Sequence, residues 1–128
     1  MLNQSGERTL VPCIAPENTA HINTLFGIVF KEDKYIPRLC GVMVSVIYDS
    51  FIKILGRGDF YWKTVSSLPL PETEQINRIS LNSLLLNSLS KFYTSLCNEC
   101  FDESFTREKW SKQDSRLDSK RFSTLTDE

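Results

Sequence analysis

The segment that decides the fold covers residues 37–56 and reads PRLCGVMVSVIYDSFIKILG. Its large apolar residues recur at spacings of three and four, which is the period of one face of an α-helix. Pro37 suits a first helical turn and Gly56 suits the position directly after a last turn. The sequence therefore predicts a helix from Ile36 or Pro37 to about Leu55. A buried strand is the alternative, because residues 42–47 are rich in β-branched side chains.

Three other stretches are rich in β-branched and aromatic residues and predict short strands, namely residues 8–14, 24–30 and 60–65. Pro12 lies in the first stretch, which favours an edge strand or a bulge. The expected fold class is therefore α+β, with short mixed or antiparallel strands packed around the central helix.

The second half of the chain begins after an extended connector, LPLP, at residues 68–71, which stops both helix and strand. Beyond it, apolar residues cover more than one face of a predicted long amphipathic helix over residues 72–101, a surface expected to be buried or paired. We therefore expect a recognition-like α+β module over residues 1–71, a helical segment over 72–105 that packs on it, and a polar tail or truncated segment over 106–128.

Composition and charge restrict the class of protein. The chain has 128 residues, with 15 Lys and Arg against 16 Asp and Glu, so one domain is expected and no global basic field draws it to nucleic acid. The longest apolar run contains Asp49 and Lys53 and falls short of a membrane span. No signal peptide is visible at the start, so we expect a cytoplasmic protein with free thiols and no membrane partner.

Few residues suggest catalysis or metal binding. Cys97 and Cys100 form a CxxC, but a structural zinc site needs four ligands, and Cys13, Cys40 and His21 provide no second pair at ligand spacing. We interpret the two cysteines as helix-packing residues. The single histidine excludes a centre of several imidazoles, and a structural role for it is favoured over ligand contact. GxSxG, P-loop and GxGxxG motifs do not occur in the sequence.

The remaining functional candidates are basic and amide side chains near turns. Arg can donate two hydrogen bonds to guanine, Asn can pair with adenine, and Lys mostly contacts phosphates. Composition alone makes each of them an ordinary solvent-facing residue. The set comprises Arg8, Asn18, His21, Asn23, Lys31, Lys34, Lys53, Arg57 and Lys63.

An ordered combination of short motifs is more specific than any single residue. It consists of ERTLVP at residues 7–12, Ala15-Pro16 with His21, VSVIYDSF at 44–51, Gly56-Arg57-Gly58, and LPLP at 68–71. This combination resembles the target recognition region of adenine-N6 DNA methyltransferases of the type IIG restriction-modification kind and of phage-defence systems such as BREX and DISARM. In that family an "ERTL…iP" strand opens the module, an "lnS…dF" helix lies in its middle, and an "lP.P" segment closes it. The similarity runs from about Glu7 to Pro71 and is weaker from Leu81 to Trp110.

The resemblance implies that this chain is the sequence reader of a bacterial, cytoplasmic enzyme that methylates adenine in duplex DNA. Such an enzyme uses S-adenosylmethionine and flips the base out of the stack. The family's Asn-Pro-Pro-Tyr and its glycine-rich cofactor motif are absent from this sequence, so catalysis and the cofactor are assigned to the parent protein and not to this chain. The implied partners are double-stranded DNA and the parent's methyltransferase domain.

The family's base-reading side chains vary with the target sequence, so the candidates come from this chain's own turns. Arg57 and Lys63, which flank the turn after the central helix, are the first choice for contacts with DNA. Asn18, His21 and Asn23 in the first loop are the second choice, and Lys53 completes the set.

A protein-interaction domain is the alternative function. In that hypothesis the helix over residues 72–101 pairs with a partner or with a second copy, and an enzyme acting alone ranks third. The dimer would bury the following side chains: Leu81, Leu84, Leu85, Leu89, Phe92 and Leu96.

Overall fold

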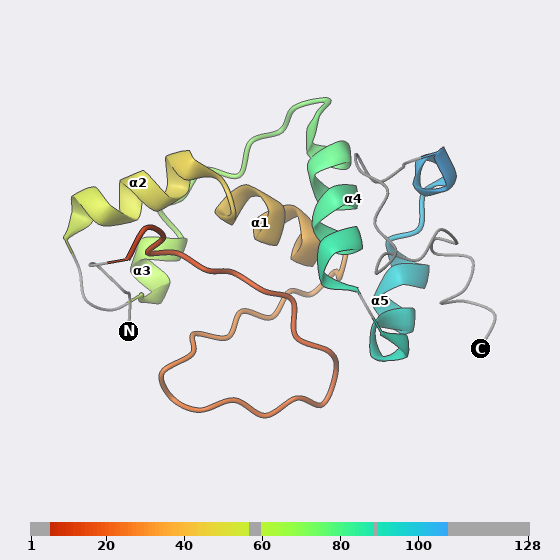
Figure 1. Ribbon diagram of the computed structural model, residues 1–128, viewed down its shortest axis with the longest axis horizontal. Coiled ribbons are helices and arrows are strands. Elements are labelled where there is room, and N and C mark those ends of the chain that lie inside the picture. Colours follow the sequence, from red (N-terminus) through yellow and green to blue (C-terminus); the bar gives the residue numbers. More distant parts are fainter. Residues whose placement is uncertain (1–5, 57–59, 89, 108–128) are drawn as a thin grey trace.

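Figure 1 shows the computed structural model, which describes residues 6–56, 60–88 and 90–107. Within these residues every regular element is helical and no strand forms, so the expected α+β fold is wrong. From one end of the molecule to the other, α2, α1, α4 and α5 follow one another, and a long irregular loop projects from their side (Figure 1). The elements are α1 (Tyr35–Met43), α2 (Val46–Leu55), α3 (Trp62–Val65), α4 (Ile76–Asn87), the 3-10 helix η1 (Lys91–Tyr93), α5 (Thr94–Glu99) and the 3-10 helix η2 (Glu103–Arg107).

The helix predicted over residues 37–55 is present as two helices. Ser45 adopts an extended conformation (φ −65°, ψ 148°) and interrupts the segment between α1 and α2. Its hydroxyl accepts a hydrogen bond from Tyr48 N at 3.3 Å and so caps the start of α2. Gly56 ends α2 in the left-handed region at φ 61°, which glycine adopts at little cost. The helical period and the glycine stop are thus confirmed, while the break at Ser45 was not expected.

The N-terminal stretch predicted as a strand runs without a partner strand among the described residues. Its backbone N–H groups donate hydrogen bonds to polar side chains instead. Thr9 N and Leu10 N each donate to Asp49 Oδ1 at 2.7 Å, and Ile14 N donates to Asn87 Oδ1 at 3.1 Å. Buried backbone groups need partners, and here polar side chains of α2 and α4 supply them. The stretch therefore lies against helices and does not enter a sheet.

The other two predicted strands are also absent. Residues 24–30 lie in the irregular loop that precedes α1. Residues 60–65 include α3, where Thr64 N and Val65 N both donate to the carbonyl of Tyr61, at 2.9 and 3.1 Å. These local hydrogen bonds take the place of a strand ladder, which needs a second strand beside it.

The long helix predicted over residues 72–101 is interrupted after α4. Ser88 has non-helical angles (φ −88°, ψ 70°). Asn87 Nδ2 donates to the carbonyl of Ser83 at 2.8 Å while its Oδ1 accepts from Ile14 N. The amide therefore competes for backbone groups at the end of the helix, a known way for Asn to oppose helix continuation. The chain continues as the separate helices η1 and α5. Of the predicted segment 106–128, residues 108–128 lie outside the described residues.

α4 packs across α1 at a glycine. A Cβ atom on Gly41 would lie 2.6 Å from Ile79 Cγ2 and 3.0 Å from the Ile79 carbonyl oxygen. Neither distance leaves room for a methyl group, so the close approach of the two helices depends on the missing side chain at position 41.

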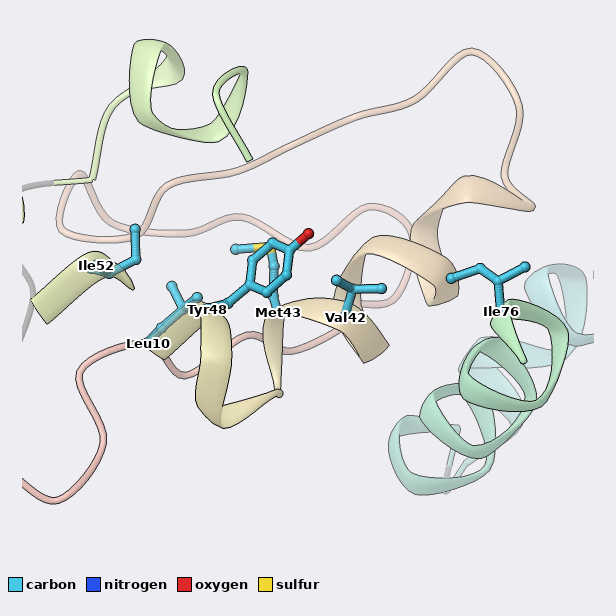
Figure 2. Close-up of a cluster of buried hydrophobic side chains, with 6 residues drawn as sticks. All are labelled: Leu10, Val42, Met43, Tyr48, Ile52 and Ile76. Carbon is cyan, nitrogen blue, oxygen red and sulfur yellow. The ribbon is translucent and has the colours of Figure 1, made fainter. Parts of the chain in front are cut away.

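Two clusters of buried side chains share α1. Figure 2 shows the first, here called the α2 cluster, as a row that runs from α2 to the start of α4. The second, the α5 cluster, lies where α1, α4 and α5 meet. The α2 cluster contains Leu10, Val42, Met43, Tyr48, Ile52 and Ile76, and the α5 cluster contains Ile14, Cys40, Leu81, Leu84 and Cys97.

Candidate nucleic-acid interface

The irregular loop before α1 carries three of the predicted DNA contacts. Asn18, His21 and Asn23 are all exposed on it. Asn18 has a left-handed backbone (φ 59°), a conformation that Asn tolerates better than most residues. The Thr19 hydroxyl donates to the carbonyl of Pro16 at 2.7 Å and closes the turn around it. The loop therefore presents Asn18 on a defined turn.

His21 folds back on its own loop. Its Nδ1 lies 3.1 Å from the carbonyl of Ile22, and a Cβ on Gly27 would lie 2.8 Å from Nε2. The imidazole thus sits over the glycine, and its Nδ1–H donates to the backbone. Leu25 N donates to the same carbonyl at 3.0 Å, which tightens this part of the loop.

Lys63 lies exposed on α3, and an aromatic contact joins its segment to the loop. The rings of Phe26 and Phe60 meet edge to face, with 5.6 Å between centroids and 87° between planes. Asn23 precedes Phe26 by three residues and Lys63 follows Phe60 by three. The structure therefore brings the loop that carries Asn18, His21 and Asn23 beside the segment that carries Lys63. Arg57, the other first choice, lies outside the described residues.

Lys53 is engaged within the chain. Its ammonium lies 3.1 Å from Asp49 Oδ2 and donates to the carbonyl of Glu7 at 2.5 Å. The lysine therefore links α2 to the N-terminal stretch.

Asp49, which the sequence did not single out, is the centre of this link. It is 4% exposed, and besides Lys53 it has Arg8 Nε 3.8 Å from Oδ1. The Arg8 guanidinium also donates to the carbonyl of Val44. The hydrogen bond from Leu10 N, followed by the contacts with Lys53 and Thr9 N, lowers the pKa of Asp49 to about 2. In the sequence, the signal for this buried role was the position of Asp49 beside the apolar residues of the predicted amphipathic helix.

The two CxxC cysteines pack in the α5 cluster, Cys97 as a buried member and Cys100 against it. All four cysteines are free; Cys40 and Cys97 are buried, Cys100 is half-buried and Cys13 is exposed. Burial raises the pKa of the Cys40 and Cys97 thiols, and burial with the nearby Asp33 and Glu99 charges raises the pKa of Cys100 to about 11. Across the described ranges, no three His, Cys, Asp or Glu side chains gather in a group that could hold a metal ion.

None of the helices within the described residues has the length and apolar character needed to cross a bilayer. No protein-family model, curated protein or solved structure matches the chain.

Proposed function

We propose that the chain is the DNA sequence-recognition module of an adenine-N6 DNA methyltransferase of a restriction-modification or phage-defence system. Double-stranded DNA is its ligand. The methyltransferase domain of the parent protein supplies the catalytic residues and binds S-adenosylmethionine. This chain contributes exposed side chains on the loop and on α3.

The observation that carries the proposal is the convergence of the motifs behind the resemblance. Leu10 from the ERTL motif and Tyr48 from the helix motif both belong to the α2 cluster, and Leu68 from the LPLP motif packs against it. Asp49 of the helix motif also binds the backbone of the ERTL motif. Motifs that are far apart in the sequence but share one core describe a folding unit, which makes their combined resemblance more specific than each short motif alone.

The alternative function has less support, because most of the side chains that it would use are already packed inside this chain, although Phe92 is exposed. A dimer through the segment over residues 72–101 would use Leu81 and Leu84, and both are already buried inside this chain within the α5 cluster. We therefore carry the DNA-recognition proposal forward alone.

A selection from a random duplex library tests the proposal. We expect the 128-residue chain to enrich one sequence motif, and its affinity to fall as salt rises, because Lys side chains that bind phosphates release counterions. Lys63→Ala should weaken binding and reduce the salt slope by about 1. Lys91→Ala is the matched control, because Lys91 is an exposed lysine on η1, at the α5 end of the molecule (Figure 1).

Two outcomes would contradict the proposal. One is a folded chain, verified by circular dichroism, that enriches no sequence motif and shows no salt-dependent binding to duplex DNA. The other is an equal loss of binding in the Lys63 and Lys91 variants, which would indicate an unspecific charge effect.

A further inference from the structure

Three exposed aromatic side chains lie near Lys63, together with Phe60, which is half-buried against the α2 cluster. Trp62 is 65% exposed, Tyr61 57% and Phe26 41%. The edge-to-face contact of Phe26 with Phe60 holds the two segments together at this surface. We call the group formed by Phe26, Phe60, Tyr61 and Trp62 the aromatic surface.

The turn that carries the aromatic surface is well fixed. α3 buries Thr64 and Val65, so its other residues, Trp62 and Lys63, remain exposed. The Tyr61 carbonyl accepts two backbone hydrogen bonds from this turn. The Ser66 hydroxyl donates to the carbonyl of Lys63 at 3.1 Å and stabilises its end. Exposed rings on a fixed backbone offer contact area at a low cost in conformational entropy.

The charge of the two segments suits an anionic ligand. Residues 18–31 and 60–71 contain no Asp or Glu, although Glu17, Glu32, Asp59 and Glu72 border them directly. Lys31 and Lys63 lie exposed on these segments. Flat apolar rings beside the Lys63 cation match a nucleic acid, whose bases stack on aromatic rings while its phosphates contact lysine. The exposed aliphatic residues of α2, such as Ile47 and Ile54, offer no ring for stacking.

We propose that the aromatic surface binds duplex DNA in which one base has left the stack. In this complex Trp62 stacks on an exposed base and the Lys63 ammonium contacts an adjacent phosphate. This inference rests on the proposed function, because methylation of adenine in a duplex requires the base to be extruded and leaves neighbouring bases without a stacking partner. Trp62 is a binding residue in this arrangement and takes no part in the chemical step.

Tryptophan fluorescence tests the inference directly. The chain has two tryptophans, so a Trp110→Phe variant leaves Trp62 as the single reporter. The probe is a duplex with one unpaired adenine, compared with the same duplex fully paired. We expect quenching of Trp62 and tighter binding with the unpaired adenine, because stacking on an indole quenches its emission.

Substitutions separate stacking from general apolar contact. In the full chain, Trp62→Leu should weaken binding to the unpaired-adenine duplex about tenfold, whereas Trp62→Phe, which keeps a ring, should recover most of the affinity. Phe92→Leu is the matched control, because Phe92 is an aromatic residue on η1 that is 70% exposed. It should bind like the wild type.

The outcomes distinguish the inference from the function on which it rests. If the chain binds duplex DNA in a salt-dependent and sequence-selective way but Trp62→Leu binds the unpaired-adenine duplex as the wild type does, the stacking role is wrong and the recognition function stands. If the folded chain binds neither duplex, both proposals fail. Quenching together with the loss in Trp62→Leu and the recovery in Trp62→Phe supports both.

Discussion

At the scale of single residues, Asp49 connects the N-terminal stretch to the helices. Its carboxylate accepts backbone hydrogen bonds from Thr9 and Leu10 and faces the cations of Arg8 and Lys53. A buried carboxylate is costly unless hydrogen bonds and opposite charges surround it, and all of these are present here. The side chain thus replaces the strand partner that the N-terminal stretch lacks.

Acid should lower the stability of the fold, because it protonates the Asp49 carboxylate. The pKa of Asp49 is about 2 when folded, against an ordinary value of 3.8. The folded state then binds fewer protons than the unfolded state, so the contribution of Asp49 is complete above about pH 4 and is lost as the pH falls toward 2. We expect Asp49→Asn to lower the urea midpoint at neutral pH and to reduce its decline below pH 4, as followed by circular dichroism.

The exposed Glu74→Gln change is the control for this pH series. It should leave both the midpoint and its pH dependence close to those of the wild type. If Asp49→Asn loses stability toward pH 2 as steeply as the wild type does, another carboxyl group governs the acid response.

The thiols should differ sharply in reactivity. Cys13 is exposed, whereas the pKa values of Cys40, Cys97 and Cys100 are raised, chiefly by burial. Because the thiolate is the reactive form, we expect one thiol to react rapidly with Ellman's reagent at pH 8 in the folded chain and all four in urea. Cys13→Ser should remove the fast phase. Rapid reaction of two or more thiols in folded Cys13→Ser would contradict the placement of the CxxC cysteines.

What the sequence could predict at this scale follows from how local each signal is. Gly56 is recognisable because one residue decides the end of a helix, and the loop position of Asn18, His21 and Asn23 follows from polar residues around Pro16. Asp49 was missed because its partners Thr9 and Leu10 lie about forty positions away. The aromatic surface was missed for the same reason, since Phe26 and Phe60 meet only in the folded chain.

At the scale of elements, the sequence predicted the helical character of residues 37–55, but it wrongly predicted strands, including one over residues 60–65 where α3 forms. A helix forms its hydrogen bonds within one segment, so the apolar period over residues 37–55 suffices to indicate α1 and α2. A strand needs a partner, and β-branched content cannot show whether one exists. For residues 8–14, side chains of Asp49 and Asn87 supply the partners. The same kind of competition, from Asn87, interrupts the helix expected over residues 72–101.

The crossing of α1 and α4 should be sensitive to a single methyl group. Gly41→Ala places a Cβ 2.6 Å from Ile79 Cγ2, so we expect a loss of about 1–3 kcal/mol in the free energy of unfolding, although alanine usually favours a helix over glycine. Urea denaturation measures the loss. In an Ile79→Ala background the same change should cost less, because the clashing Cγ2 is gone while the close contact with the carbonyl oxygen of residue 79 remains. Equal costs in both backgrounds would show that the Ile79 side chain does not limit the space at Gly41.

At the scale of the whole molecule, α1 links the two clusters of buried side chains. Val42 and Met43 belong to the α2 cluster and Cys40 to the α5 cluster. A short helix that contributes to both cores cannot lose one set of contacts without disturbing the other. We therefore expect the described helices to unfold as one cooperative unit, although they lie in a row along the molecule (Figure 1).

Two core substitutions test this cooperativity. Ile52 in the α2 cluster is 1% exposed and Leu84 in the α5 cluster is 0% exposed, so replacing either with alanine should cost about 2–5 kcal/mol. Because α1 couples the clusters, each variant should keep a single transition in which helix content, followed by circular dichroism, and Trp62 emission in a Trp110→Phe background change together. If Leu84→Ala lowers the midpoint for helix content but leaves the Trp62 transition in place, the two clusters are independent units and α1 does not couple them.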